Sequence, residues 1–153
     1  MIRHLTVSAI ILQDDHVLLI EHRKSGLFLP PGGHLDDHEL PTDAVHREVL
    51  EEVGLTVEIL AKKPFSHPAV TTLEAPFTIV VIDNVADPAV GPHTHIDLVY
   101  VCRPTSAQIT LDPNEVDGCR WVPLTEVASL RTPAELPALI TTAAKYAETA
   151  ESY

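Results

Sequence analysis

Cysteine is scarce in this chain, and its two copies, Cys102 and Cys119, form no C-x-x-C pair. That argues against a disulfide scaffold and against a cysteine-ligated zinc site, and it suits a reducing compartment. Long apolar runs are also missing: the longest, such as residues 77–82, are far too short to span a bilayer. Residues 1–7 lack the apolar core and cleavage site of a signal peptide. We therefore expect a soluble, cytoplasmic protein with no membrane partner.

Basic residues are few as well: 10 Lys and Arg stand against 22 Asp and Glu, which gives a net charge of -12. Such a surface repels a nucleic-acid backbone, so a duplex is not an expected partner. An acidic protein can still act on a small polyanion if a local device cancels the repulsion, and bound divalent cations are the usual one.

The chain has 153 residues, which predicts one domain spanning residues 1–153. A chain of this length buries roughly 70% of the surface that its unfolded form exposes, so it needs no covalent staple. The composition, 45% hydrophobic and 21% charged, is that of an ordinary globular protein.

Short strands dominate the predicted secondary structure, so the expected fold class is α+β or mixed α/β. A main helix is predicted at 41–53, a short one at 125–130, and a last one from 132–133 toward 148, which Pro137 is expected to kink or delay. A turn at 13–16 joins the first two strands into a hairpin, and 83–92 is the longest expected loop. Strands are predicted at residues 6–12, 17–20, 56–60, 77–82, 95–103 and 120–122, and residues 27–29 form a short apolar piece that ends in Pro30-Pro31-Gly32-Gly33.

The helix at 41–53 begins with a proline, which suits its first turn, and Gly54 suits the position just beyond its end. Leu40 is a poor N-cap. At about 100° per residue, three carboxylates fall within an arc of about 100°. They are Glu48, Glu51 and Glu52. An all-oxygen carboxylate cluster is the ligand set that Mg²⁺ or Mn²⁺ requires.

An apolar arc lies on the opposite side of this helix and predicts its core face. Its members are Val45, Val49, Leu50 and Val53. His46 also falls inside this arc, and the sequence offers no explanation for it. A solvated acidic face is the ordinary interpretation of the three glutamates, but the surrounding sequence favours a functional one.

The surrounding sequence supplies a longer pattern. It consists of Gly33, five residues, Glu39, seven residues, Arg47-Glu48-Val49, one residue, Glu51-Glu52, one residue and Gly54-Leu55. This spacing resembles the signature of the Nudix (MutT-like) hydrolases, G-x5-E-x7-R-E-U-x-E-E-x-G-U with U aliphatic. Every defined position of that signature is filled, so the resemblance is specific.

The resemblance implies an α/β/α sandwich around a mixed sheet, with the signature forming a loop-helix-loop. It also implies hydrolysis of a nucleoside diphosphate linked to another moiety, a nucleoside triphosphate included, by attack of water at phosphorus with Mg²⁺ or Mn²⁺. By resemblance Glu48, Glu51 and Glu52 bind metal and Arg47 holds one of these carboxylates in place. Glu39 and Gly54 then support the loop-helix-loop, while the Gly33 backbone can approach metal or phosphate because it has no Cβ.

The sequence leaves two glutamates as candidates for the general base. Glu48 is one candidate and Glu115, six residues before Trp121, is the other. Related enzymes often place a further catalytic or metal-binding glutamate in a loop before a Trp-containing strand. The alternative is that Glu115 is only a turn residue in an acidic loop.

A second polar motif, His93-Thr94-His95-Ile96-Asp97, precedes an apolar strand. On a strand His93, His95 and Asp97 share one face, where they could bind a metal, contact a phosphate or pair with one another. We predict either a substrate-binding role for the three or a structural one, with Asp97 anchoring a histidine or a loop. His67 is a weaker candidate for the same site.

The substrate is less well defined than the reaction. Sequence patterns typical of several Nudix subclasses are absent, and Phe28, Phe77, Tyr100 and Trp121 could stack on a base or simply fill the core. The alternative function is a non-catalytic Nudix-like domain that binds a nucleotide as a sensor. Such domains generally lose glutamates of the signature, and none is lost here, which favours a hydrolase. A small nucleotide is the expected partner, and a homodimer is left open.

Overall fold

The computed structural model describes residues 1–85 and 87–153. Its helices are α1 (Pro41–Val53) and α2 (Leu136–Ala147), with a 3₁₀ turn, η1 (Leu124–Ser129). Its strands are β1 (Arg3–Gln13), β2 (His16–His22), β3 (Phe28–Leu29), β4 (Gly32–His34), β5 (Val57–Ala61), β6 (Thr78–Val85), β7 (His93–Pro104), β8 (Val116–Pro123) and β9 (Glu151–Ser152). None of the helices in these ranges is long and apolar enough to cross a membrane.

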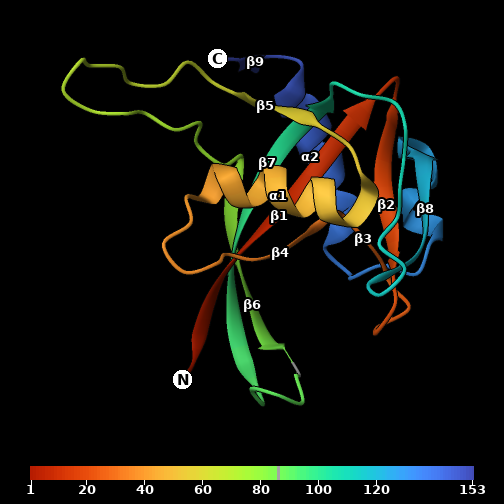
Figure 1. The fold of residues 1–153 in the computed structure, drawn as a ribbon. Helices are drawn as coiled ribbons and strands as arrows, with labels where there is room; N and C mark the ends of the chain where they lie inside the picture. Colours follow the sequence, from red (N-terminus) through yellow and green to blue (C-terminus); the bar gives the residue numbers. More distant parts are fainter. Residues whose placement is uncertain (86) are drawn as a thin grey trace.

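The sheet is mixed and is organised around two long neighbouring strands, β1 and β7, which run parallel. On the far side of β7, β6 pairs with its first half and β5 with its second half, both antiparallel. On the far side of β1, β4 and β2 pair antiparallel in the same way. The paired β6 and β7 extend well beyond the helices, beside the N-terminus (Figure 1).

Helices cover both faces of this sheet, with α1 in front of β1 and α2 behind it (Figure 1). Alternate residues of β1 enter two separate cores, because successive side chains of a strand point to opposite faces. Val7 and Ile11 pack on the α1 side, whereas Ile10 packs on the α2 side. The predicted α/β/α sandwich around a mixed sheet is confirmed.

Helix α1 has the predicted bounds, and Val45, Val49 and Val53 are buried as predicted. One member of the predicted core face was wrong, because Leu50 is 55% exposed; His46, whose place in that arc the sequence left unexplained, is exposed as well. The buried side of the helix is rotated toward its glutamates, because the facing segment consists of two glycines that leave room for carboxylates.

Several predicted bounds also differ from the structure. β6 and β7 are longer than predicted, so the connection between them is shorter than 83–92, and the longer loop is 62–77. The sequence analysis did not predict β4, whose glycines have little strand propensity. Pro137 does delay α2, which begins at Leu136 so that the proline lies in its first turn, and η1 begins at Leu124 rather than at Thr125.

Candidate active site

Three carboxylates converge beside the C-terminal half of α1. Glu48 and Glu52 are 8% and 2% exposed, and Glu115 joins them from the segment just before β8, so that one oxygen of each lies within 4.8 Å of the others. The first two were predicted from helical spacing, and Glu115 from its position before Trp121. Glu51 is not a member of this compact group: its side chain is 56% exposed.

Strand β4 closes over the two buried carboxylates. The Gly32 N–H donates to Glu52 Oε1 at 2.7 Å. A Cβ on Gly33 would lie 2.5 Å from Glu48 Oε1, which is closer than real Cβ contacts come. A Cβ on Gly32 would lie 2.1 Å from the Val7 carbonyl oxygen. A larger residue at position 33 would therefore displace Glu48, and one at position 32 would clash with the backbone of β1, so the Gly-Gly pair lets backbone lie directly against the carboxylates.

Arg47 connects the glutamates of the signature. Its Nε and Nη2 donate to the two oxygens of Glu39 at 2.8 and 2.9 Å, a bidentate pair, and its Nη1 donates to Glu48 Oε1 at 3.0 Å. The same Nη1 lies 3.3 Å from Glu51 Oε2. Glu39 in turn accepts the Asp36 N–H at 3.0 Å. A planar guanidinium can hold several carboxylates in this way, which a lysine cannot.

Burial makes the two inner carboxylates hard to ionise. Desolvation raises the pKa of Glu48 to about 7, against the opposing effect of Arg47. Desolvation also raises the pKa of Glu52 to about 8, although the Gly32 N–H partly offsets it. Neighbouring carboxylates, Glu115 among them, raise both further. Excess negative charge held in a small buried space is what a divalent cation would relieve.

The loop that carries Glu115 is attached to the end of α1 by backbone hydrogen bonds. The helix ends at Gly54, whose φ of 72° is left-handed, and its N–H donates to the Leu50 carbonyl. Thr110 N–H then donates to the Val53 carbonyl at 2.8 Å, and Asp112 N–H to the Glu52 carbonyl at 3.1 Å. These contacts, between segments far apart in sequence, bring Glu115 to the helix; no local sequence pattern encodes them.

The second motif lies on the other face of the sheet. Asp97 is 6% exposed and accepts hydrogen bonds from the Thr6 and Ser8 hydroxyls, both at 2.7 Å. It anchors β7 to β1 through two hydroxyls, whereas the structural alternative named a histidine or a loop as the anchored group. His93 and His95 lie nearer the end of the same face.

Two further histidines, which the sequence analysis missed, join His93 and His95 there: His4 on β1 and His34 on β4. His67 does not belong to this group: it is exposed and lies in the loop at 62–77. The spacing of His4 and His34 carries no signal, because it is strand pairing that brings them to the motif.

The candidate stacking aromatics are mostly packing groups. Tyr100 is 2% exposed, and Trp121 packs on the α1-side core. Phe77 lies against Tyr146, with ring centroids 5.1 Å apart. The Arg120 guanidinium covers the Phe28 ring at 4.5 Å. Within the described residues these contacts favour the structural interpretation.

Comparison with known proteins agrees with this geometry. The family model described as the NUDIX domain matches residues 2–142. A solved structure of a Nudix-family hydrolase from Clostridium perfringens is 29% identical and has a TM-score of 0.79, covering 95% of this chain and 98% of that one.

Two curated relatives are also similar to this chain. The m7GpppN-mRNA hydrolase NUDT17 of Danio rerio is 30% identical over an alignment of 128 residues that covers 74% of this chain and 40% of the relative. A probable DHNTP pyrophosphohydrolase of Lactococcus lactis subsp. cremoris (strain MG1363) is 31% identical over 97 residues, 63% of this chain and 52% of the relative. The chain thus spans about half the length, or less, of these relatives.

Proposed function

Since the chain belongs to the Nudix hydrolase family, which acts on nucleotide pyrophosphate bonds, we propose that it is a divalent-cation-dependent pyrophosphohydrolase of a nucleoside triphosphate or of a nucleoside diphosphate linked to another moiety. The observation that carries the proposal is the convergence of Glu48, Glu52 and Glu115 within 4.8 Å. A purely nucleotide-binding domain would not need a buried carboxylate cluster whose assembly costs so much desolvation.

The residues fit Mg²⁺ or Mn²⁺. The donors are all carboxylate oxygens, and the Gly33 backbone lies against Glu48 with no side chain between them. Glu48 and Glu52 would hold the cation, with the Gly33 backbone adjacent and the Glu115 carboxylate beside them. That Glu51 is a ligand remains a prediction. Its exposed carboxylate pairs with Arg47 and would have to turn toward Glu48 and Glu52 to reach the cation.

Hydrolysis requires an oxygen–phosphorus bond to form and the anhydride P–O bond to break, while the attacking water loses a proton. A bound divalent cation offsets the charge of the diphosphate and lowers the pKa of water. The chain itself positions the reaction: Arg47 fixes the orientation of Glu48, and the Gly32 N–H fixes that of Glu52. Fixed orientation of such groups before the reaction is a large part of catalysis.

We assign the proton-accepting role to Glu115. Glu48 is committed to Arg47, and Glu52 to the Gly32 N–H, and both are buried. Glu115 is exposed, so its carboxylate can meet water entering from solvent. A general base has to reach the attacking water directly.

The test is release of inorganic phosphate or pyrophosphate from a panel of nucleotides with Mg²⁺ or Mn²⁺. The panel would include nucleoside triphosphates, dinucleoside polyphosphates, nucleotide sugars, capped RNA and DHNTP, the last two because of the two curated relatives. We expect turnover of at least one compound that stops in excess EDTA and returns with Mn²⁺. Binding of a nucleotide with no turnover under any cation would establish the sensor alternative instead, and full turnover in EDTA would refute metal dependence.

A further inference from the structure

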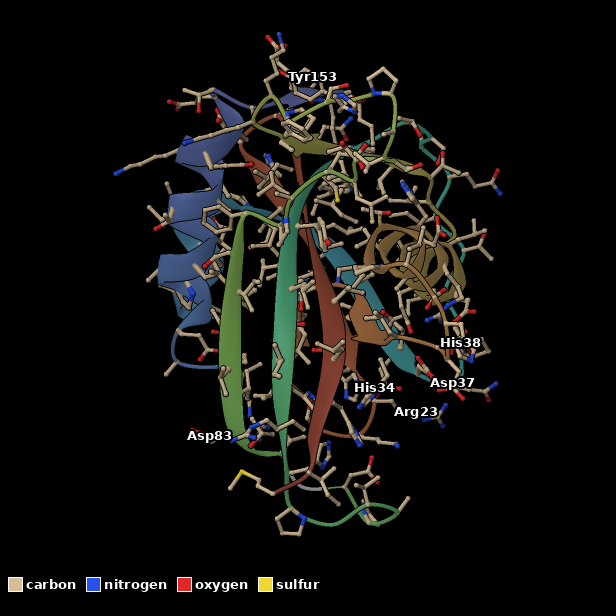
Figure 2. The ribbon with its side chains drawn as sticks, turned by 90° about the vertical axis from the view of Figure 1, so that its left-hand side faces the viewer. Arg23, His34, Asp37, His38, Asp83 and Tyr153 are labelled. Carbon is tan, nitrogen blue, oxygen red and sulfur yellow. The ribbon has the colours of Figure 1, made fainter. Side chains whose placement is uncertain are left out.

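Four imidazole rings meet at the end of the sheet where β6 and β7 extend beyond the helices. They belong to His4 on β1, His34 on β4, and His93 and His95 on β7, and one ring nitrogen of each lies within 4.8 Å of the others. All four nitrogens come from segments fixed by strand pairing: His4 lies directly opposite His95, and His34 opposite Thr6. Figure 2 shows His34 in the lower half of the view, with Asp83 of β6 lower and to the left.

The rings form a closed quadrilateral. Neighbouring ring centroids are 4.7 to 5.1 Å apart around the circuit His4, His34, His95, His93, and the two diagonals are 6.3 and 6.5 Å. Two nitrogen pairs are already close: His93 Nε2 to His95 Nε2 at 2.8 Å, and His4 Nδ1 to His34 Nε2 at 3.2 Å. Tetrahedral zinc with bonds of 2.0–2.1 Å needs ligand nitrogens about 3.3 Å apart.

One of these rings is oriented as a metal ligand usually is. His93 Nδ1 lies 2.9 Å from the Gly91 carbonyl oxygen, which can only accept, so Nδ1 carries the proton. The lone pair of His93 is therefore on Nε2, the atom that faces His95. A ligating histidine typically donates its other N–H to a carbonyl or carboxylate in this manner. At 2% exposure, His93 has no freedom to turn away.

From this geometry we propose that His4, His34, His93 and His95 form a zinc site, distinct from the oxygen-ligand site on α1. The two sites lie on opposite faces of the sheet, because Gly33 on β4 faces Glu48 and the next residue, His34, faces the other way. Four nitrogen donors from protein are the closed, tetrahedral set of a structural zinc site. The proposal does not depend on the proposed function.

The chemistry of the rings favours a cation over a phosphate. Desolvation and the neighbouring rings lower the pKa of His95 to about 4, and the same causes lower that of His34. Uncharged rings offer lone pairs, which a metal ion accepts, but no charge for an anion. The acidic groups nearby also disfavour an anion: Asp97 lies one position inward on the same face, and Asp87 acts electrostatically on His34 and His95.

The experiment is titration of the metal-free full chain with Zn²⁺, and with Co²⁺ as a spectroscopic probe, in a large excess of Mg²⁺. Mg²⁺ occupies carboxylates but competes poorly for imidazole, so only the nitrogen site remains available. We expect one retained zinc per chain after dialysis, a higher melting temperature, and the intense visible bands of tetrahedral cobalt. No retained zinc, or only the weak bands of octahedral cobalt, would overturn the proposal.

Variants locate the site. Loss of a group that only hydrogen-bonds to a metal ligand weakens metal binding roughly 10- to 100-fold. His95→Ala and the exposed His34→Ala each remove a ligand itself, so each should weaken zinc binding by more than that. His67→Ala, which removes an exposed histidine elsewhere, should bind as the unaltered chain does, and so should Glu52→Gln. Melting in EDTA checks that each variant is folded, and His34→Ala is the safer test since its side chain is at the surface. Zinc retained equally by the His34 and His95 variants would place it elsewhere and refute the assignment.

Discussion

Arg47 donates from Nη2 to the backbone carbonyl of His34 at 2.9 Å, so the guanidinium that organises the glutamates also holds β4. The two bonds to Glu39 complete this arrangement. Strand β4 consequently has one residue, Gly33, against Glu48 and the next, His34, among the imidazoles. The position of β4 relative to α1 is held by Arg47 and by the Gly32 N–H bond to Glu52 rather than by apolar packing of β4 itself, which has no apolar side chain.

Arg47→Lys should separate geometry from charge. The substitution keeps the positive charge but loses the fork that bridges Glu39, Glu48 and the His34 carbonyl. We expect turnover to fall roughly 100-fold and the free energy of unfolding to drop by about 1–2 kcal/mol. Steady-state kinetics and chemical denaturation measure both. Arg103→Lys, at an exposed pair with Glu58, is the matched control and should change neither; equal effects of the two substitutions would contradict the role of Arg47.

Glu52→Gln tests whether the buried carboxylate is functional. The Gln amide oxygen can still accept the Gly32 N–H, so the fold is kept, and removal of a poorly solvated charge should leave stability level or slightly higher without metal. Turnover should fall by roughly 1,000-fold, because charge developing on the diphosphate loses preorganised stabilisation. Glu126→Gln, an exposed change on η1, is the control. Near-normal turnover of the Glu52 variant at saturating Mg²⁺ would mean that the acidic face is merely solvated.

The burial of the Glu52 carboxylate should also appear in how the stability of the metal-free protein depends on pH. The folded-state pKa of Glu52, about 8, lies above the ordinary value of 4.5, so the folded protein binds more protons between these values. The contribution of Glu52 to stability is therefore present below pH 4.5 and lost as the pH rises through 8. The melting temperature of the unaltered chain should drop relative to that of Glu52→Gln between pH 5 and pH 8. If the difference in melting temperature between the two proteins stays constant from pH 5 to pH 8, the raised pKa of Glu52 is refuted.

Glu115→Gln distinguishes a proton acceptor from a ligand. If Glu115 accepts the proton, kcat should fall roughly 10²- to 10⁴-fold while the Mn²⁺ concentration for half-maximal activity stays the same. A rise in the Mn²⁺ requirement would instead make Glu115 a ligand and return the base role to Glu48.

The sequence predicted α1 and its glutamates well because helical periodicity and the Nudix signature are both local. It misplaced Leu50, since a helical wheel shows which residues share a face but not which face meets the sheet. Here the glycines of β4 decide that, by admitting Glu48 and Glu52 in place of apolar side chains. Which face of α1 is buried therefore depends on its contact with β4, and the spacing of apolar residues along the helix does not show it.

The histidine group illustrates the same limit. His93 and His95 were found because they stand two residues apart on one strand. His4 and His34 lie far from them in sequence, and only the register of β1 with β7 and β4 brings the four together. Without pairing information, an isolated histidine near the start of a chain gives no indication of its neighbours.

Asp97→Ala tests whether the buried aspartate is structural. Its carboxylate accepts from Thr6 and Ser8 at 2.7 Å, and its removal leaves two hydroxyls without that partner and a small cavity between β1 and β7. Unsatisfied buried groups cost about 1–3 kcal/mol each, so we expect a loss of about 2 kcal/mol in unfolding free energy after the gain from removing a desolvated acid. Turnover of all substrates should fall alike, in proportion to folded protein.

Asp97→Asn is the matched variant, because it keeps an oxygen acceptor and nearly the same volume. Desolvation raises the pKa of Asp97, so an uncharged amide suits the position and should retain most of the stability. His95→Ala completes the comparison: its ring lies on the sheet face away from the catalytic glutamates, so it should leave the order of substrate preference unchanged, and an altered order would place the histidine in a substrate pocket. A change in substrate order in Asp97→Asn at unchanged stability would assign Asp97 to the substrate pocket instead.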